Sequence, residues 1–323
     1  MAPRFCVAGV GAVGGLIAAR LAQAGHRVCL MARGARLAQL QDAGLRVAAD
    51  GGAAPALRLE ASDRPVFGVQ DFVVLATKAQ ALPGLLPSLL PMIGPQTCLI
   101  PVVNGIPWWY FQGIDGAPER AVAAVDPGGV LLRLIPARQI LGCVAFLTSA
   151  LRDDGVVVAS GRPRLSLGEI DGADRPRGQE LAGWLSAAGV ETRAVPNIRA
   201  VLWTKLALNL ATNPFSVVTG AGVREMFTDP NLLPIATTVM QEARVVAAQY
   251  GEAFVMSLDQ MLEAGRSAGP FATSMLQDFA AGRPLELGAI GHSALELAAE
   301  KGLDMPIVRC LVMLAAHRAG SRM

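Results

Sequence analysis

The sequence is poor in the residues that most often carry metal and imidazole chemistry. Its three histidines are far apart in the chain, at His26, His292 and His317. Such isolated histidines disfavour both histidine-based catalysis and a zinc site. The five cysteines form no CxxC pair and no metal-ligand spacing, so we expect no metal centre and five reduced core thiols. They are Cys6, Cys29, Cys98, Cys143 and Cys310.

Charge runs and long apolar runs are also missing. The formal net charge is +2 and no cluster of Lys and Arg stands out, which disfavours a nucleic-acid partner but allows a small anionic ligand. Although 52% of the residues are hydrophobic, polar residues, Gly or Pro interrupt every apolar run before the roughly 18 to 20 residues of a spanning helix. No export signal is visible. The sequence predicts a cytoplasmic protein without a membrane partner and does not indicate the oligomeric state.

A glycine pattern dominates the N-terminus. Residues 4–10 are typical of a short buried strand, and a GxGxxG motif at residues 9–14 opens a helix that continues through residue 21. In this setting the glycines permit a tight turn, close approach of a pyrophosphate, and close packing of helix and strand. The sequence therefore predicts a Rossmann-type domain that binds a dinucleotide. The expected cofactor contacts in the motif are Gly9, Gly11, Ala12, Val13 and Gly14.

The end of the second predicted strand indicates which dinucleotide binds. Residues 27–32 are followed by Arg33 and Arg36, where an NAD-specific protein would commonly carry an acidic residue for the ribose hydroxyls. An arginine suits a 2′-phosphate instead, so NADP(H) is the expected cofactor. The alternative is an exposed arginine that has no ligand.

Two more strands of this domain end in polar residues. The strand predicted at residues 71–77 leads to Lys78, and the strand at 97–103 leads to Asn104. Ligands bind at the carboxyl ends of such strands, so we expect both residues at the cofactor site. The alternatives are a surface lysine and a turn-forming asparagine.

An aromatic segment, residues 106–111, follows Asn104 at once. It serves either as a core anchor for the loop or as a wall of the substrate pocket, and the sequence favours neither.

The remaining pattern predicts an α/β N-terminal Rossmann domain, residues 1–196, followed by an all-α C-terminal domain, residues 197–323. The boundary falls near Pro196, where strand signals end. The first domain is expected to add a helix at 35–43, strands at 45–49, 56–61, 121–125, 140–147, 156–159 and 165–167, a helix at 178–188 and a strand at 190–195. The second is expected to have helices at 199–213, 232–250, 258–264, 272–281, 287–301 and 306–319.

The first helix of the second domain carries a polar stripe on an apolar background. Lys205, Asn209 and Asn213 are four residues apart, which places them on one helix face. Lysine is scarce, with three among 28 basic residues, and a buried ammonium requires a partner, a ligand or water. The stripe therefore lines a cavity, unless it is simply a solvated face.

These motifs, in this order, resemble the ketopantoate reductase family over essentially the whole chain. The resemblance rests on the N-terminal GxGxxG, Lys78, the Asn104-Gly105 pair, the sequence WTKLALNLATNP from Trp203, and SMLQD from Ser274 with Glu286 twelve residues after Ser274. It implies NADPH-dependent reduction of 2-dehydropantoate to pantoate, in pantothenate biosynthesis.

The resemblance also implies residue roles. Lys205 matches the catalytic general acid, and Asn209 and Asn213 match residues that line the pocket and position the lysine. Ser274 and Glu286 match substrate-contacting residues. Lys78 and Asn104 match residues at the cofactor–substrate junction. The chemistry agrees, because a positioned ammonium can stabilise and then protonate the oxygen that becomes negative when hydride reaches a ketone.

The sequence differs from the family pattern in two places where the shape of the substrate is expected to be recognised. The family commonly has a further asparagine after this helix, whereas residues 219–224 contain none, and the aromatic segment 106–111 replaces a short turn. Three hypotheses for the function remain. The protein reduces ketopantoate, it reduces another 2-oxo acid in the same way, or it is a catalytically silent protein that senses NADP(H).

Overall fold

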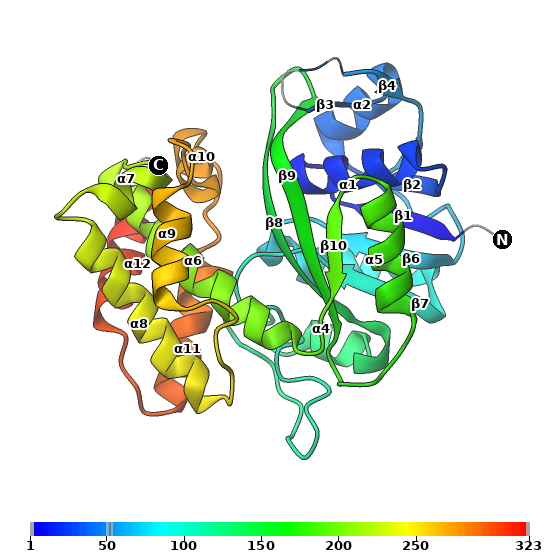
Figure 1. The fold of residues 1–323 in the computed structure, drawn as a ribbon. Coiled ribbons are helices and arrows are strands. Elements are labelled where there is room, and N and C mark those ends of the chain that lie inside the picture. Colours follow the sequence, from blue (N-terminus) through cyan, green and yellow to red (C-terminus); the bar gives the residue numbers. More distant parts are fainter. Residues whose placement is uncertain (1–2, 50–51, 53, 321–323) are drawn as a thin grey trace. The chain divides into compact units, whose positions relative to one another are not determined.

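The computed structural model describes residues 3–49, 52 and 54–320, which form two compact units (Figure 1). The first unit contains the chain up to Val103 together with Phe111–Arg120 and Gly129–Ile198. The second contains Asn104–Tyr110, Ala121–Gly128 and the chain from Arg199 onward. The N-terminal half of the sequence therefore contributes two short segments to the helical unit.

A five-stranded parallel sheet organises the first unit. Its strand order is β5-β2-β1-β6-β7, and every neighbouring pair runs parallel. The strands span Arg4–Ala8 (β1), Arg27–Met31 (β2), Glu60–Ser62 (β5), Gln70–Leu75 (β6) and Ile93–Pro101 (β7). Because β2 and β6 lie on opposite sides of β1, the strand order reverses there, and such a switch point is where open α/β sheets bind ligands.

A second sheet is built around one long strand, β9 (Val156–Glu169). On one edge, β3 (Leu45–Ala49) and β10 (Glu191–Ala194) run parallel to its two ends. On the other edge, β8 (Leu141–Leu151) runs antiparallel to it. This pairing joins the predicted strands at 156–159 and 165–167 into one, because β8 pairs with β9 on both sides of the gap between them.

The expected single strand at residues 56–61 is wrong. The chain changes sheets within it: β4 (Ala56–Leu57) pairs with β3 in the second sheet, whereas β5 pairs with β2 in the first.

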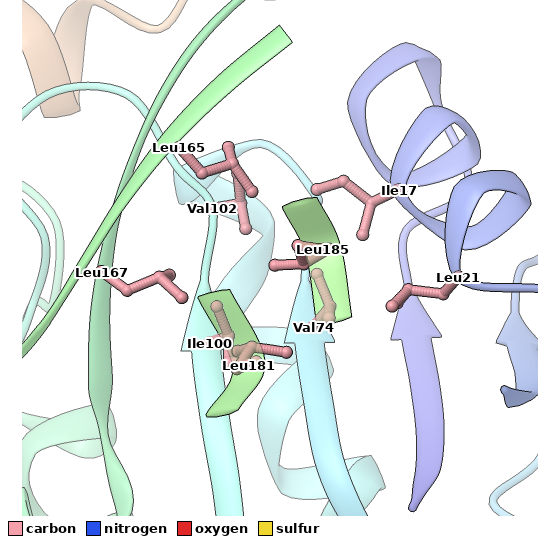
Figure 2. Close-up of a pocket in the computed structure, with 9 residues that line it drawn as sticks. All are labelled: Ile17, Leu21, Val74, Ile100, Val102, Leu165, Leu167, Leu181 and Leu185. Atoms are coloured by element: carbon pink, nitrogen blue, oxygen red, sulfur yellow. The ribbon is translucent and has the colours of Figure 1, made fainter. Parts of the chain in front are cut away.

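Helix α1 (Ala12–Gln23) packs against strands of both sheets, and apolar side chains fill the space around it. The helices of this unit are α1 (Ala12–Gln23), α2 (Gly34–Ala43), α3 (Leu82–Leu89), α4 (Val130–Leu134) and α5 (Arg177–Ala187). The sequence patterns did not predict α3 and α4. Figure 2 shows a small cavity whose lining is wholly aliphatic, which identifies it as part of the core. Its lining residues are Ile17, Leu21, Val74, Ile100, Val102, Leu165, Leu167, Leu181 and Leu185.

Helices make up the second unit, as predicted. They are α6 (Ile198–Thr219), α7 (Val223–Thr228), α8 (Leu233–Gln249), α9 (Leu258–Arg266), α10 (Ser274–Ala280), α11 (Ser293–Glu300) and α12 (Pro306–Gly320). Short α7 was not predicted. The expected helix at 287–301 divides into a π-helical turn, Gly288–His292, followed by α11.

The predicted end of α6 at Asn213 is too early. Proline costs a helix one backbone hydrogen bond, yet α6 continues past Pro214 to Thr219. Phe215 and Val217 are buried on this last part of the helix. Burial of these apolar side chains outweighs the lost bond.

Two further expectations are corrected by the second unit. Residues 121–125 form a loop that ends in a turn at 123–125, and not a strand, because the backbone N–H groups of Ala123 and Ala124 donate to the Glu296 carboxylate. Cys310 is exposed, whereas the other four cysteines are buried. It lies on the outward face of α12, next to the exposed Arg309.

Among the described residues, no helix combines the length and apolar character needed to cross a bilayer. The same residues contain no group of three His, Cys, Asp or Glu side chains placed to hold a metal ion.

Candidate active site

A chain of hydrogen bonds in the second unit links an ammonium to a carboxylate through an amide. The Lys205 Nζ on α6 donates to the Asn104 Oδ1 at 2.9 Å. The Asn104 Nδ2 donates in turn to the Glu286 Oε2 at 3.4 Å. Because an ammonium only donates and an ionised carboxylate only accepts, the amide can be oriented in one way only. Three residues that are distant in sequence therefore form one polar group, in which the Glu286 side chain is buried.

The position of Asn104 is fixed by its neighbour, Gly105. Gly105 has φ +80°, and a β-carbon there would lie 1.9 Å from the Ala289 carbonyl oxygen. The next residue, Ile106, donates its N–H to the same oxygen at 2.8 Å. Ala289 belongs to the π-helical turn that follows Glu286, so one backbone contact holds Asn104 and Glu286 near each other. Only glycine permits this approach.

The rest of the stripe on α6 belongs to a second hydrogen-bonded group. The Asn213 Nδ2 donates to the Asn209 Oδ1 at 3.2 Å. The Asn213 Oδ1 accepts from the Ser274 Oγ and from the Met275 N–H, each at 3.3 Å. Asn213 is buried, while Lys205 and Asn209 are half-buried, so the stripe is not a fully solvated face. Ser274, in the first turn of α10, is exposed.

The Asn209 Nδ2 makes no hydrogen bond with any described residue, although the atom is buried. A buried donor without an acceptor costs roughly 1 to 3 kcal/mol. Asn209, a member of the second group, lies one helical turn from both Lys205 and Asn213. Such a donor is suited to an oxygen atom of a ligand.

In the first unit the glycine motif has the geometry that a dinucleotide requires. Gly9 has φ +95°, and a β-carbon there would lie 2.5 Å from the Thr77 side chain. A β-carbon at Gly14 would lie 2.1 Å from the Gly9 carbonyl oxygen. At Gly11, which precedes α1, nothing lies within 4 Å of the β-carbon position. Two glycines are thus required by packing, whereas the middle one leaves open space where a pyrophosphate could approach.

The first turn of α1 is also suited to an anion. It contains no acidic residue, and no side chain caps its N-terminus. The backbone N–H groups at the start of a helix carry a partial positive charge that attracts phosphate. These features fit a bound dinucleotide at Ala12, Val13 and Gly14.

Three basic residues follow the carboxyl ends of strands β6 and β2 in the sequence. Lys78, three residues after β6, is half-buried and precedes a 3-10 turn. Arg33, two residues after β2, is exposed at the start of α2. Arg36 is half-buried, and its Nε donates to the Val10 carbonyl oxygen at 2.7 Å. Lys78 and Arg33 thus belong to the first unit, whereas the polar groups around Lys205 belong to the second.

The family that this site represents follows from comparison with known proteins. The model for Ketopantoate reductase PanE/ApbA matches residues 5–172, and the model for its C-terminal part matches residues 197–319. The chain belongs to the ketopantoate reductase family.

Relatives match the chain along its full length. The 2-dehydropantoate 2-reductase of Mesorhizobium japonicum is 34% identical and covers 99% of this chain and 98% of its own length. A solved structure from Ralstonia solanacearum, assigned as a ketopantoate reductase, is 37% identical with a TM-score of 0.92, covering 100% of this chain and 99% of that one. D-mandelate dehydrogenase, solved with NADH and anilino(oxo)acetate, has a TM-score of 0.85 at 21% identity over 98% and 99% of the chains, which shows a shared fold.

The aromatic segment, residues 106–111, anchors the loop after Asn104 in the core. Trp108, Trp109 and Tyr110 are each 1% exposed. The Trp203 Nε1 on α6 donates to the Tyr110 hydroxyl at 2.7 Å, and burial raises the pKa of Tyr110 above its usual value. These contacts favour the core anchor over the pocket wall. They also attach the segment after Asn104 to the helix that carries Lys205.

Sequence reasoning missed the contacts that support the site. The Asn-Gly pair does indicate a positive φ at Gly105, but no sequence pattern identifies Ala289 as its partner. Similarly, nothing near Thr273 in the sequence indicates that its hydroxyl meets that of Ser216 at 2.6 Å and so joins the start of α10 to α6.

Proposed function

We propose that this protein reduces a 2-oxo acid to a 2-hydroxy acid, with 2-dehydropantoate as substrate, NADPH as reductant and Lys205 as the general acid. The observation that carries the proposal is the hydrogen-bonded group of Lys205, Asn104 and Glu286. The relative from Mesorhizobium japonicum, named 2-dehydropantoate 2-reductase, supports the reaction and the substrate.

The chemistry of Lys205 follows from its charge and its partner. NADPH, when bound, supplies the hydride to the ketone carbon, and the ketone oxygen then becomes negative. A positioned ammonium stabilises that oxygen and donates a proton to it. Asn104 accepts one of the three N–H donors of the ammonium. Because the amide is neutral, it orients Lys205 without cancelling its charge.

The remaining polar residues suit the other groups of the substrate. Pantoate and its 2-oxo precursor carry a carboxylate and a hydroxyl group beyond the reacting carbon. Glu286, as an ionised carboxylate, can accept a hydrogen bond from that hydroxyl. The Asn209 Nδ2, which has no acceptor among the described residues, can donate to an oxygen of the substrate. Asn213 and Ser274 support Asn209 through the contacts described above.

The glycine motif and its neighbours would hold the dinucleotide. The open space at Gly11 and the uncapped first turn of α1 fit the pyrophosphate. The exposed guanidinium of Arg33 suits the 2′-phosphate that distinguishes NADPH from NADH. Lys78 follows β6 at the switch point and suits the part of the cofactor near the substrate.

Steady-state kinetics with a panel of 2-oxo acids tests this proposal. We expect the highest kcat/KM with ketopantoate and NADPH. A higher kcat/KM with another 2-oxo acid would support the proposed reaction but identify that acid, and not ketopantoate, as the substrate. Tight NADPH binding without turnover of any 2-oxo acid would refute the enzymatic proposal in favour of a cofactor-sensing protein.

A further inference from the structure

Arg36 makes the contact that links α2 to the glycine loop. Its Nε donates to the Val10 carbonyl oxygen at 2.7 Å, and its Nη1 donates to the Gly155 carbonyl oxygen at 2.8 Å. Val10 lies between Gly9 and Gly11, at the centre of the loop, whereas Gly155 lies in the turn between β8 and β9. One guanidinium therefore joins the two sheets of the first unit at the glycine motif.

The turn between β8 and β9 is attached by two more side chains. Gln39 donates to the Asp153 carbonyl oxygen at 3.2 Å, and Arg46 donates to that of Asp154. Among these three side chains, Arg36 is the one that also contacts the glycine loop. Arg46 is therefore a natural control, since it has the same charge and is bonded to the same turn.

The nitrogen atoms of Arg36 are not available to an outside phosphate. Nε and Nη1 are bonded to carbonyl oxygens, and Nη2 is buried. Burial, with the nearby Arg46, lowers the pKa of Arg36. Arg33, by contrast, is exposed.

We propose that Arg36 is a positioning residue, which orients the glycine loop for either dinucleotide and does not select between NADPH and NADH. In a trans peptide the carbonyl oxygen and the following N–H point in opposite directions. By holding the Val10 carbonyl, Arg36 fixes the direction of the Gly11 N–H at the start of α1. This inference rests on dinucleotide binding at the glycine loop, as proposed above.

The test compares Arg36→Ala, Arg46→Ala and Arg33→Ala. For each variant, the Kd of NADPH and of NADH is measured by titration calorimetry, and hydrogen exchange of residues 10–14 is measured without any dinucleotide. We expect Arg36→Ala to weaken both dinucleotides by about tenfold, the loss of a charged hydrogen bond, and to accelerate exchange at residues 10–14. Arg46→Ala should change neither the binding of the dinucleotides nor the exchange at residues 10–14. Arg33→Ala should weaken the binding of NADPH and leave that of NADH unchanged.

The two measurements separate the possible failures. If Arg36→Ala weakened NADPH but not NADH, Arg36 would be a phosphate ligand and the proposal would be overturned. Unchanged exchange at residues 10–14 would equally overturn it. If the unmodified protein bound neither dinucleotide, the proposed function would fail, while the exchange measurement would still decide whether Arg36 orders the loop. Should Arg36→Ala not fold, Arg36→Lys replaces it, with the same expected direction because lysine cannot donate to both carbonyls in this geometry.

Discussion

Lys205 and Asn104 are joined by a hydrogen bond of 2.9 Å from the ammonium to the amide oxygen. Asn104 also donates to Glu286, so the amide stands between a cation and a carboxylate. Because the amide is neutral, this hydrogen bond orients the ammonium and leaves its positive charge intact. This arrangement is suited to an acid that must meet a developing negative charge.

Lys205→Ala should lower kcat by about 10²- to 10⁴-fold, the usual contribution of a positioned proton donor. The Kd of NADPH should stay near normal, because the glycine loop lies in the other unit. Single-turnover kinetics and calorimetry measure the two quantities separately. Retention of most of the turnover would assign the acid role elsewhere, with Lys78 the next candidate.

Glu286→Gln should reduce the preference for hydroxylated 2-oxo acids. A buried carboxylate that loses one of its hydrogen-bond donors is destabilised, so a site built around a substrate hydroxyl rejects analogues that lack it. The measurement is the ratio of kcat/KM for ketopantoate to that for 2-oxoisovalerate, in both proteins. We expect a large ratio in the unmodified protein and a smaller one in the variant. A ratio of one or less before mutation would indicate an apolar 2-oxo acid as substrate.

Gly105→Ala should destabilise the protein and disturb the site. Its β-carbon would overlap the Ala289 carbonyl oxygen, at 1.9 Å. Overpacking and a left-handed backbone together cost about 2 to 5 kcal/mol. Gly116→Ala is the matched control, because Gly116 has φ +71° and open space around its β-carbon position. That control should lose only about 1 to 2 kcal/mol, the backbone part of the cost. Urea unfolding measures the free energy of unfolding of both variants. Equal losses of stability would show that the contact with Ala289 does not contribute.

Asp171→Asn should remove a pH-dependent part of the stability of the first unit. Two hydrogen bonds of 2.7 Å from Arg175 hold the pKa of the Asp171 carboxyl below its usual value. A lowered folded pKa means that the stabilisation is present above the unfolded pKa, about 3.9, and is lost as the pH falls through the folded value.

At pH 7 the variant should therefore be less stable by about 1 to 2 kcal/mol, and the two unfolding curves should converge in acid. Glu191→Gln is the control, since its pair with Arg193 is largely exposed and such pairs contribute about 0 to 1 kcal/mol. A difference for Asp171→Asn that persisted unchanged to pH 2 would contradict this origin.

Local sequence patterns were sufficient for much of the fold. The glycine motif predicted the strand, turn and helix at residues 4–21, and the structure confirms them. The spacing of Lys205, Asn209 and Asn213 predicted one polar helix face, because helical geometry alone relates residues four apart. The all-helical character of the second unit was equally visible in its periodicity and its glycine caps.

Tertiary structure decided the features that depend on distant partners. The turn within residues 121–125 is held by hydrogen bonds to the Glu296 carboxylate. Helix α6 continues past Pro214 because the side chains of Phe215 and Val217 are buried in the core. The meeting of Asn104 with Lys205 and Glu286, and that of Arg36 with Val10, join residues that no local pattern relates. A sequence pattern encodes the preferences of one segment, whereas a hydrogen bond between distant segments exists only after burial has brought donor and acceptor together.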